Sequence, residues 1–428
     1  MKLTPLLVGS GAVLLGLFSV LPRSEAQQGA GCAFDNAGLE LPRGFCAQVV
    51  AEDLAAARHL TVAANGDIFV ATGPTRREQD AGGVVALRDT DGDGRADERV
   101  SFGSGTGDDV EFRGDYLYFS THGTVVRYPW TSGSLEPAGP ADTVVRDLPA
   151  VRSHQAKSIA FGPDNALYVN IGSPSNSCQV QDRSSGVPGK DPCEELETRA
   201  GIWRFDADRL GQTQSDGGRF ATGLRNTVAL TAHPGTGQLY GVIHGRDQLW
   251  ANWPDYFTEE QSAEKPSEEF VLIEQDDDFG WPYCYHDPEL GHKVLAPEYG
   301  GDGSVVGRCS AVKEPLIGFP AHWAPNGVLF YSGHQFPAKY HNGAFIAFHG
   351  SWNRSPLPQA GYNVVFVPFD GTDPDGSWEV FADGFAGAEV GPREAAHRPV
   401  GLAVGPDGSL YVSDDKSGTI FRIMYTGN

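Results

Sequence analysis

The stretch LAVGPDGSLYV, residues 402–412, carries the pattern that decides the fold of this chain. Two short runs of alternating apolar residues flank a Pro-Asp-Gly turn, which is the sequence pattern of a β-hairpin. Clear copies of this pattern recur along the chain, and a looser one lies at residues 326–331. The other copies occupy residues 60–70, 110–119, 159–169 and 229–240.

Several copies continue into a third strand that contains an apolar residue next to a basic one, as at residues 84–88, 201–205 and 419–423. A sheet of four strands repeated every ~40–50 residues is typical of a β-propeller. We therefore expect an all-β fold, a six-bladed β-propeller that occupies residues 27–428 as one domain. In this scheme the fifth blade is long, with insertions around residues 284–309 and 352–361. Unrelated β-sandwiches would not share one period.

The composition agrees with a globular protein rich in turns. The chain of 428 residues has 55 glycines and 29 prolines, and 40% of its residues are hydrophobic. Its formal net charge is −23. Nucleic acids and anionic membranes attract basic surfaces, so we expect neither of them as a partner.

The first 26 residues have the pattern of a secretory signal peptide. Lys2 precedes an apolar run over residues 6–21, and Ser24 and Ala26 provide the small residues that precede a cleavage site. A membrane anchor is the alternative, but the run is short and Pro22 interrupts it. We expect a soluble protein that is exported to the periplasm or secreted.

Export permits disulfide bonds, and the six cysteines form three local pairs along the sequence. Six cysteines allow fifteen connectivities, so pairing between neighbours is one hypothesis among many. No C-x-x-C spacing supports a metal site instead. We favour three disulfides: Cys32 with Cys46, Cys178 with Cys193, and Cys284 with Cys309.

Polar residues just ahead of the innermost strand of each blade would meet at one mouth of the central channel. Three arginines and several histidines in this set predict a cationic pocket for a small polyanion, because arginine binds carboxylates through paired hydrogen bonds. A histidine there could act as a general base near neutral pH. The residues at these positions are Arg58, His59, Asp108, Asp109, Ser153, His154, Arg225, Asn226, His322, His397 and Arg398.

The chain resembles the quinoprotein glucose/sorbosone dehydrogenase family, and its sorbosone and pyranose dehydrogenase branch in particular. These proteins are six-bladed propellers that carry pyrroloquinoline quinone (PQQ). The resemblance rests on the order and spacing of short motifs across nearly all of the mature chain. They are LPRGF (41–45), SH (153–154), FGPD (161–164), GLRN (223–226), HG (244–245), FGWP (279–282), WAPNGVLFY (323–331), HGSWNR (349–354) and HRP (397–399).

The resemblance implies a PQQ-dependent oxidoreductase that oxidises an aldose or a related polyhydroxy aldehyde by hydride transfer. His154 matches the general base, and Arg225 matches an arginine near the reacting quinone oxygen. Main-chain carbonyls of Gly245 and Arg246 match ligands of a Ca²⁺ ion that bridges protein and PQQ. The remaining positions that match cofactor contacts are Arg58, Asn226, His322, His349, Arg354 and Arg398.

A second Ca²⁺ site is suggested by residues 89–97, which read DTDGDGRAD. Asp89, Asp91, Asp93 and Asp97 take positions 1, 3, 5 and 9 of a loop like that of an EF-hand, with glycine at position 6. The twelfth position is Val100, so the usual bidentate glutamate is missing. A solvated turn is the equally weighted alternative.

Two other functions remain open from the residues alone. One is a Ca²⁺-dependent propeller hydrolase such as a sugar lactonase, although that chemistry favours a channel richer in carboxylates. The other is a propeller that binds a ligand without catalysis. Because the chain has no C-x-x-C-H haem motif, a dehydrogenase would pass its electrons to a separate acceptor such as a cytochrome.

Overall fold

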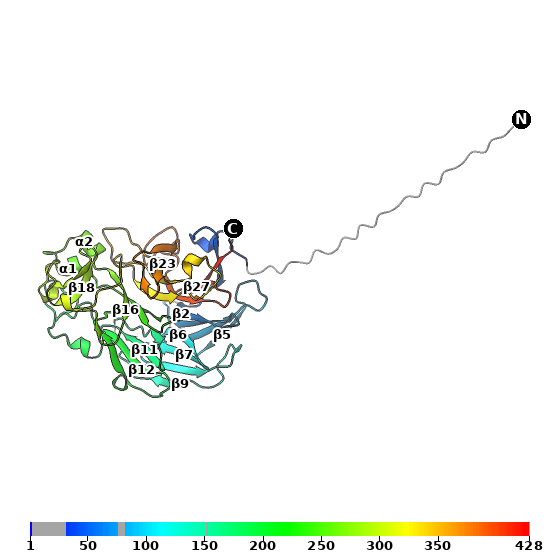
Figure 1. The fold of residues 1–428 in the computed structure, drawn as a ribbon, viewed down its shortest axis with the longest axis horizontal. Coiled ribbons are helices and arrows are strands. Elements are labelled where there is room, and N and C mark those ends of the chain that lie inside the picture. Colours follow the sequence, from blue (N-terminus) through cyan, green and yellow to red (C-terminus); the bar gives the residue numbers. More distant parts are fainter. Residues whose placement is uncertain (2–30, 76–81, 151–152, 428) are drawn as a thin grey trace.

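The computed structural model describes Met1 and residues 31–75, 82–150 and 153–427. The predicted signal peptide therefore lies, apart from Met1, outside the described residues. The described part of the chain is built almost entirely from short β-strands and has two short α-helices. Its sheets form a six-bladed β-propeller, as the sequence repeat predicts (Figure 1).

Each blade contains four antiparallel strands that lie side by side from the axis outwards, and blade three gains a short parallel strand at its outer edge. Blade one comprises β2 (Ala56–Val62), β3 (Ile68–Gly73), β4 (Gly83–Arg88) and β5 (Glu98–Phe102), and blade two comprises β6 (Gly107–Arg113), β7 (Tyr116–Thr121), β8 (Val125–Pro129) and β9 (Asp142–Val145). Blade three comprises β10 (Ile159–Phe161), β11 (Ala166–Ile171), β12 (Gly201–Asp206) and β13 (Gly218–Thr222), and blade four comprises β14 (Ala229–Ala232), β15 (Leu239–Ile243), β16 (Glu268–Ile273) and β20 (Ile317–Phe319).

The last two blades complete the ring, and the N-terminal strand closes it. In blade six, β1 pairs with β28 and so provides the outermost strand from the opposite end of the chain. The N-terminal and C-terminal segments are therefore hydrogen-bonded into one sheet, and β27 lies beside β2 of blade one (Figure 1). Blade five comprises β21 (Pro325–Phe330), β22 (Gly343–Phe348), β23 (Asn363–Asp370) and β25 (Glu379–Ala382), with β24 (Asp373–Pro374) at its edge, and blade six comprises β26 (Pro399–Val404), β27 (Leu410–Asp414), β28 (Thr419–Tyr425) and β1 (Phe45–Ala51).

The hydrophobic core is divided into layers between successive blades. Six clusters of buried residues each combine side chains from two neighbouring blades, and together they cover all six blade interfaces. The middle strands are covered on both faces, which explains why β3, β11 and β22 are buried along their whole length. Such strands read as continuous apolar runs instead of alternating ones.

The largest insertion belongs to blade four, which corrects our assignment of the 284–309 segment to blade five. That segment lies between β16 and β20, the third and fourth strands of blade four, because β20 returns to pair with β16. A further excursion between β15 and β16 holds both α-helices. The insertions contain α1 (Leu249–Asn252), α2 (Glu259–Glu264), β17 (Asp277–Asp278), β18 (Cys284–Asp287) and β19 (His292–Leu295).

Short 3-10 helices occur in the loops, at Asn36–Gly38, Glu194–Glu197, Gln214–Asp216, Pro297–Tyr299, Gly307–Ala311 and Ala338–Tyr340. Across the described ranges, we find no helix that is both long enough and apolar enough to cross a membrane. All six cysteines are paired as we favoured, in the bonds Cys32–Cys46, Cys178–Cys193 and Cys284–Cys309.

The inner strands deliver polar residues to one mouth of the ring through local irregularities. In β2, β6, β21 and β26 the pairing register shifts near the first residues of the strand. Arg58 and His59 occupy such a shift in β2, Asp108 occupies one in β6, and Asn326 occupies one in β21. Bulges of this kind redirect side chains and are frequent beside active sites.

Candidate active site

Two cavities lie at this mouth and share His154. The first has a volume of about 350 Å³ and is lined by residues from the entry to blade three onwards through blade six. The second has a volume of about 410 Å³ and is lined by blades one and two and the segment that leads into blade three. The first cavity brings together His154, Arg225, Asn226, His244, Gly245, Asp247, Glu268, His322, Ala324, Asn326, His349, Gly350, Trp352, Asn353 and Arg398.

His154 is held in one orientation and one tautomer. Its Nδ1 lies 2.8 Å from the carbonyl oxygen of Ser173 and 3.0 Å from the Ser173 hydroxyl oxygen. Because a carbonyl oxygen only accepts, Nδ1 carries the proton and Nε2 keeps its lone pair. Burial, together with repulsion from Arg225, holds the pKa of His154 well below its usual value. His154 is therefore a neutral imidazole with a free basic nitrogen at neutral pH.

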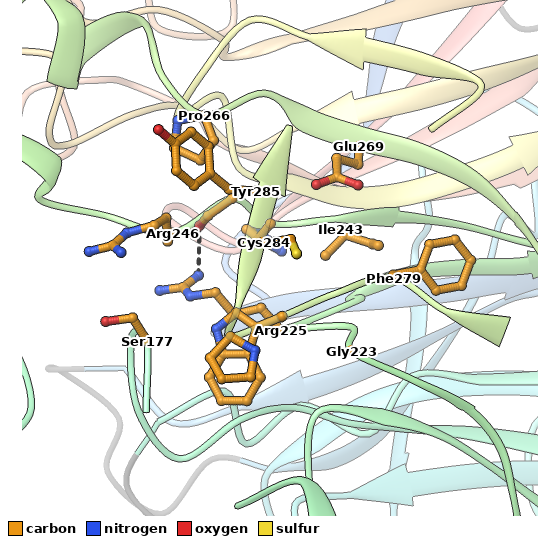
Figure 2. Close-up of a pocket in the computed structure, with 14 residues that line it drawn as sticks. Ser177, Gly223, Arg225, Ile243, Arg246, Pro266, Glu269, Phe279, Cys284 and Tyr285 are labelled. Carbon is orange, nitrogen blue, oxygen red and sulfur yellow. Dashed lines mark hydrogen bonds between the residues drawn. The ribbon is translucent and has the colours of Figure 1, made fainter. Parts of the chain in front are cut away.

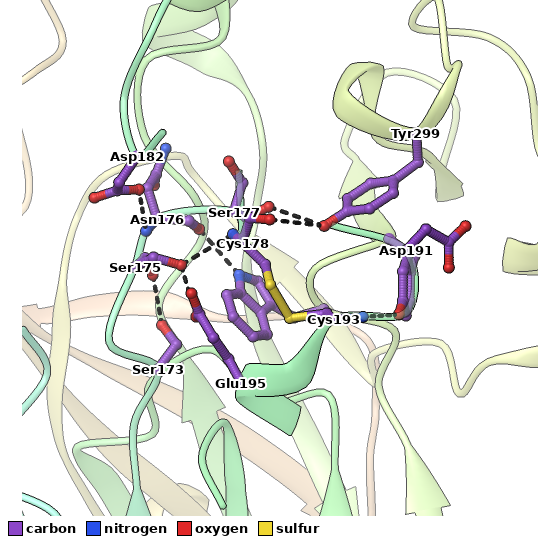
Figure 3. Close-up of a disulfide and its surroundings, with 12 residues drawn as sticks. Ser173, Ser175, Asn176, Ser177, Cys178, Asp182, Asp191, Cys193, Glu195 and Tyr299 are labelled. Atoms are coloured by element: carbon purple, nitrogen blue, oxygen red, sulfur yellow. Dashed lines mark hydrogen bonds between the residues drawn. A yellow bond between two sulfur atoms is a disulfide. The ribbon is translucent and has the colours of Figure 1, made fainter. Parts of the chain in front are cut away.

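Arg225 is the best-anchored side chain of the first cavity. Its Nη1 donates to the carbonyl oxygen of Gly245 at 2.8 Å, the bond drawn in Figure 2. Its Nε and Nη2 donate to the carbonyl and side-chain oxygens of Asn176, at 3.2 and 3.1 Å. Asn176 lies two residues before Cys178, whose disulfide with Cys193 fixes this loop (Figure 3). The disulfide thus supports the position of Arg225.

Asp247 joins several of these elements. Its Oδ2 accepts hydrogen bonds from Arg183 at 2.9 Å and Arg225 at 3.1 Å, and its Oδ1 accepts one from Asn353 at 2.8 Å. Burial acts to raise the pKa of Asp247, but Arg225, His322 and Arg183 together hold it well below its usual value. Asp247 is therefore an ionised carboxylate inside the cavity.

Glu268 spans two blades beneath the same cavity. Its Oε2 accepts from the backbone N–H of Gly245 at 2.7 Å, and its Oε1 accepts from that of Ala324 at 3.0 Å. Burial raises the pKa of Glu268 to about 7. The carboxyl group fixes the turn after β15 against the segment that leads into β21, where His322 and Ala324 adopt left-handed backbone conformations with φ of 64° and 58°.

Arg398 is held by backbone carbonyl oxygens instead of by an ion pair. Its Nε and Nη2 donate to the carbonyl oxygens of His349 and Gly350, at 3.0 and 2.8 Å. By contrast, Arg58 forms an ion pair with Asp415 at 2.8 Å, and Asp415 also accepts a hydrogen bond from His349 at 2.7 Å. An anion in the first cavity would find its strongest partner in Arg398.

The mouth is less cationic than the sequence suggests. Arg225 and Arg58 are paired with Asp247 and Asp415, and the first cavity also contains Glu268. Its four histidines are neutral at pH 7, because burial lowers each pKa, to about 3 for His244. The histidines that line it are His154, His244, His322 and His349.

Most of the predicted site residues converge, and a few do not. Arg58 lines the second cavity instead of the first. Arg354 lines neither cavity, since its guanidinium donates to the carbonyl oxygens of Ala263, Ala321 and Pro358 and so braces a loop. Arg246 lines neither cavity. Its side chain lines a separate small pocket (Figure 2) and pairs with buried Glu298.

Only three of the four carboxylates proposed for the second Ca²⁺ come together. Oxygen atoms of Asp89, Asp91 and Asp97 lie within 4.8 Å of one another. Asp93 is outside this group, and its Oδ1 accepts a hydrogen bond from the backbone N–H of Arg95 at 2.7 Å. A Ca²⁺ ion in this loop remains a prediction.

Comparison with known proteins places the chain in a family. The family model described as TrAA12-like matches residues 39–426. The chain belongs to the TrAA12-like family. In sequence this TrAA12-like protein is 29% identical over 306 residues to the PQQ-dependent pyranose dehydrogenase of Coprinopsis cinerea, which covers 60% of the chain and 38% of that enzyme.

Other relatives extend the comparison. An uncharacterized protein of Borreliella burgdorferi is 31% identical over 208 residues, or 48% of each chain, and the PQQ-dependent sugar dehydrogenase of Hypocrea jecorina is 23% identical over 346 residues, or 74% of this chain and 73% of that one. The TrAA12-like protein thus spans less than half the length of the Borreliella and Coprinopsis relatives.

Solved structures show the same propeller. The holo form of the PQQ domain of Coprinopsis cinerea pyranose dehydrogenase superposes with a TM-score of 0.71 at 21% identity, covering 90% of this chain and 97% of that one. The calcium structure of the Trichoderma reesei family AA12 enzyme gives a TM-score of 0.71 at 20% identity, covering 91% and 97%. These similarities support the fold.

Sequence reasoning missed several residues that shape the site of the TrAA12-like protein. Asp247 directly follows the predicted Gly245–Arg246 turn, so its position near that turn could have been noticed. Glu268 and Ser173 carry no such signal, because each acts through contacts between segments far apart in sequence. Asp415, which joins Arg58 to His349, follows β27 and is equally invisible in the linear pattern.

Proposed function

We propose that this protein is an exported PQQ-dependent dehydrogenase that oxidises an aldose or a related polyhydroxy aldehyde. The observation that carries the proposal is the placement of His154, a neutral histidine with a free Nε2, in the wall shared by two polar cavities. The names of the relatives in Coprinopsis cinerea and Hypocrea jecorina point to the same chemistry.

The first cavity fits PQQ in its donor chemistry. PQQ is a flat molecule with three carboxylates, and the cavity offers the guanidinium of Arg398 as well as the side-chain amides of Asn226 and Asn353. His322 and His349 add ring nitrogens at the same wall. When bound, PQQ supplies the two-electron acceptor that the side chains of this protein lack.

The turn after β15 fits a Ca²⁺ ion beside that cofactor. Ca²⁺ prefers oxygen ligands, including main-chain carbonyls and carboxylates. Gly245 lines the first cavity, where Asp247 and Glu268 add carboxyl oxygens, and its carbonyl oxygen also accepts the hydrogen bond from Arg225. We propose that the main-chain oxygens of Gly245 and Arg246 would hold the ion, which would supply Lewis-acid chemistry beside the cofactor.

His154 supplies the acid–base step in this proposal. The carbonyl of Ser173 fixes the proton on Nδ1, so Nε2 accepts the proton of the sugar hydroxyl as the C–H bond breaks. Arg225, held in place by Asn176 and Gly245, keeps a positive charge beside the electron-accepting group of the cofactor, where negative charge would develop. Protonated His154 then returns its proton to solvent through the open mouth.

The proposal includes a cellular location and a partner class. We propose that residues 1–26 direct export, that residues 27–428 form the mature propeller, and that a separate electron acceptor such as a cytochrome reoxidises the cofactor. The three disulfides are compatible with an oxidising compartment.

Reconstitution tests the function directly. The exported protein is mixed with PQQ and Ca²⁺, and the reduction of an artificial dye is followed with a panel of aldoses. We expect a cofactor absorbance band and sugar-dependent dye reduction, with both requiring Ca²⁺. A protein that binds no PQQ and reduces no dye with any aldose would exclude the proposal and leave a hydrolase or a binding propeller.

The His154→Ala variant tests the proposed base. We expect it to bind PQQ as tightly as the wild type and to lose at least 100-fold in kcat, since a positioned base contributes about 10²–10⁴-fold. Absorbance titration of PQQ and steady-state dye reduction measure the two properties. His292→Ala, in the β18–β19 hairpin, is the control. Full turnover in His154→Ala would show that another group accepts the proton.

A further inference from the structure

The second cavity has a chemistry of its own. It is lined by polar side chains of several kinds and by small residues, and among its described lining residues there is no phenylalanine, tyrosine or tryptophan. The cavity contains both hydrogen-bond donors and acceptors. This suits a ligand with hydroxyl groups, because a hydroxyl both donates and accepts hydrogen bonds. The lining residues with polar side chains are Arg58, Thr106, Asp108, His122, His154 and Gln155.

Asp108 is a fixed acceptor at the base of this cavity. Its Oδ2 accepts a hydrogen bond from the backbone N–H of Lys157 at 2.9 Å, which ties β6 to the segment before β10. Its Oδ1 lies 3.3 Å from Nε2 of His122. The carboxylate is 3% exposed, whereas the His122 side chain is 32% exposed. His122 therefore presents a ring oriented by Asp108 to whatever enters.

Arg58 also lines this cavity. Only its Nη1 takes part in the ion pair with Asp415, and the side chain is 18% exposed at the cavity wall. Asp415 also forms a hydrogen bond with His349 of the first cavity, so Asp415 links the Arg58 side chain to the wall of that cavity. A donor from Arg58, an acceptor from Asp108 and the ring of His122 thus surround one space that opens onto His154.

We propose that His122, oriented by Asp108 in this second cavity, determines which sugars bind beside His154. The inference rests on the proposed function, because the first cavity is reserved for the cofactor. A pyranose that places its oxidised C–OH at His154 directs its other hydroxyls toward Asp108, His122 and Arg58. The ligand class is a neutral polyhydroxylated ring, since Arg58 is compensated by Asp415 and Asp108 is a carboxylate.

The test measures sugar binding apart from turnover. 1,5-Anhydroalditols of gluco, galacto and manno configuration, which lack the oxidisable hemiacetal, are titrated calorimetrically into the protein with and without PQQ and Ca²⁺. We expect His122→Ala and Asp108→Asn to raise Kd at least tenfold for the best ligand. With dye and a substrate sugar, KM should rise by a similar factor while kcat stays within threefold.

Two measurements keep this inference separate from the proposed function. PQQ affinity should be unchanged in His122→Ala, and His292→Ala should bind sugars like the wild type. A Kd and KM within twofold of wild type in His122→Ala, or no binding of any anhydroalditol by the wild type, would overturn the sugar site. Failure of PQQ binding with sugar binding intact would instead overturn the proposed dehydrogenase and retain the cavity assignment.

Discussion

At the scale of single residues, a hydrogen bond to a backbone carbonyl oxygen holds the proposed base, His154, in place. His154 is oriented by the carbonyl of Ser173 and has no carboxylate partner among the described residues that bond to its ring. A carboxylate partner would raise the pKa of the imidazole, whereas burial and Arg225 lower it here. The imidazole therefore remains neutral under mildly acidic conditions.

This lowered pKa predicts an unusual pH dependence. The proposed base is active when neutral, and protonation inactivates it only as the pH falls through its lowered pKa. We therefore expect kcat/KM for the sugar to stay high down to pH 6.5, the usual pKa of histidine, and to decline only below it. Ferricyanide, an acceptor that takes up no proton, serves as the oxidant in the measurement. Because Glu268 lines the same cavity and has a pKa of about 7, the Glu268→Gln variant is measured alongside, and half of the activity lost at pH 6.5 or above in both proteins would contradict the assignment.

Single residues also show what the sequence could and could not predict. The positions ahead of the inner strands were predictable because strand order fixes where those segments meet, and His154, Arg225 and Arg398 line the first cavity as expected. Arg354 is far enough along its loop to turn outward and bind three carbonyl oxygens. Glu268 was not predictable, because its partners Gly245 and Ala324 are joined to it only by the packing of two blades.

At the scale of elements, the repeat has a physical explanation in its turn. In blade six, Asp407 of the Pro-Asp-Gly turn accepts hydrogen bonds from Ser409 at 2.6 Å and from Arg422 of β28 at 2.7 Å. In blade one, Asp67 and Arg88 of β4 form the corresponding pair at 2.6 Å. The basic residue in the third strand therefore ties that strand to the hairpin turn between the first two.

We expect Asp407→Ala to lower the free energy of unfolding by about 1–2 kcal/mol, because it removes both a turn hydrogen bond and a half-exposed ion pair. Asp407→Asn should lose less, since an asparagine amide can keep the contacts to Ser409. Urea denaturation measures both, with exposed Glu136→Ala as the control. Equal stability of Asp407→Ala and the control would mean that the repeat is maintained for another reason.

Elements also explain the error in the blade assignment. Counting hairpin copies placed residues 284–309 with the next copy, because nothing in the local sequence of β20 marks it as the fourth strand of blade four. Its pairing with β16 spans an insertion of more than forty residues, Glu274 to Leu316. Only the geometry of the blade reveals where such a strand belongs.

At the scale of the whole molecule, the two cavities at the mouth of the ring are formed by different blades and are proposed to bind different molecules. Blades four, five and six surround the cavity proposed for the cofactor, and blades one and two surround the cavity proposed for the sugar. His154 enters from blade three, between the two halves. The Arg58–Asp415–His349 contacts join the halves on the opposite side, where blade six meets blade one. The site therefore depends on closure of the ring.

Closure of the ring depends on β1, and within β1 on Phe45. Its ring packs edge-on against Phe336, Phe381 and Tyr340 of blade five, with centroid distances of 4.8, 5.0 and 5.5 Å. It is 8% exposed, so Phe45→Ala leaves a cavity between blades five and six. The closing strand would remain paired with β28 but lose its main apolar anchor.

Truncating a buried phenylalanine to alanine typically lowers the free energy of unfolding by about 3–5 kcal/mol, and we expect Phe45→Ala to have an effect of that size. Val380→Ala, at a position 42% exposed on β25, should change it by less than about 0.5 kcal/mol. Phe45→Ala should also weaken PQQ binding at temperatures where the wild type is fully folded, since His349 and Arg398 lie on either side of the same blade interface. Denaturant unfolding and PQQ titration measure the two effects. If Phe45→Ala matched Val380→Ala in both, the site would not depend on the closing strand.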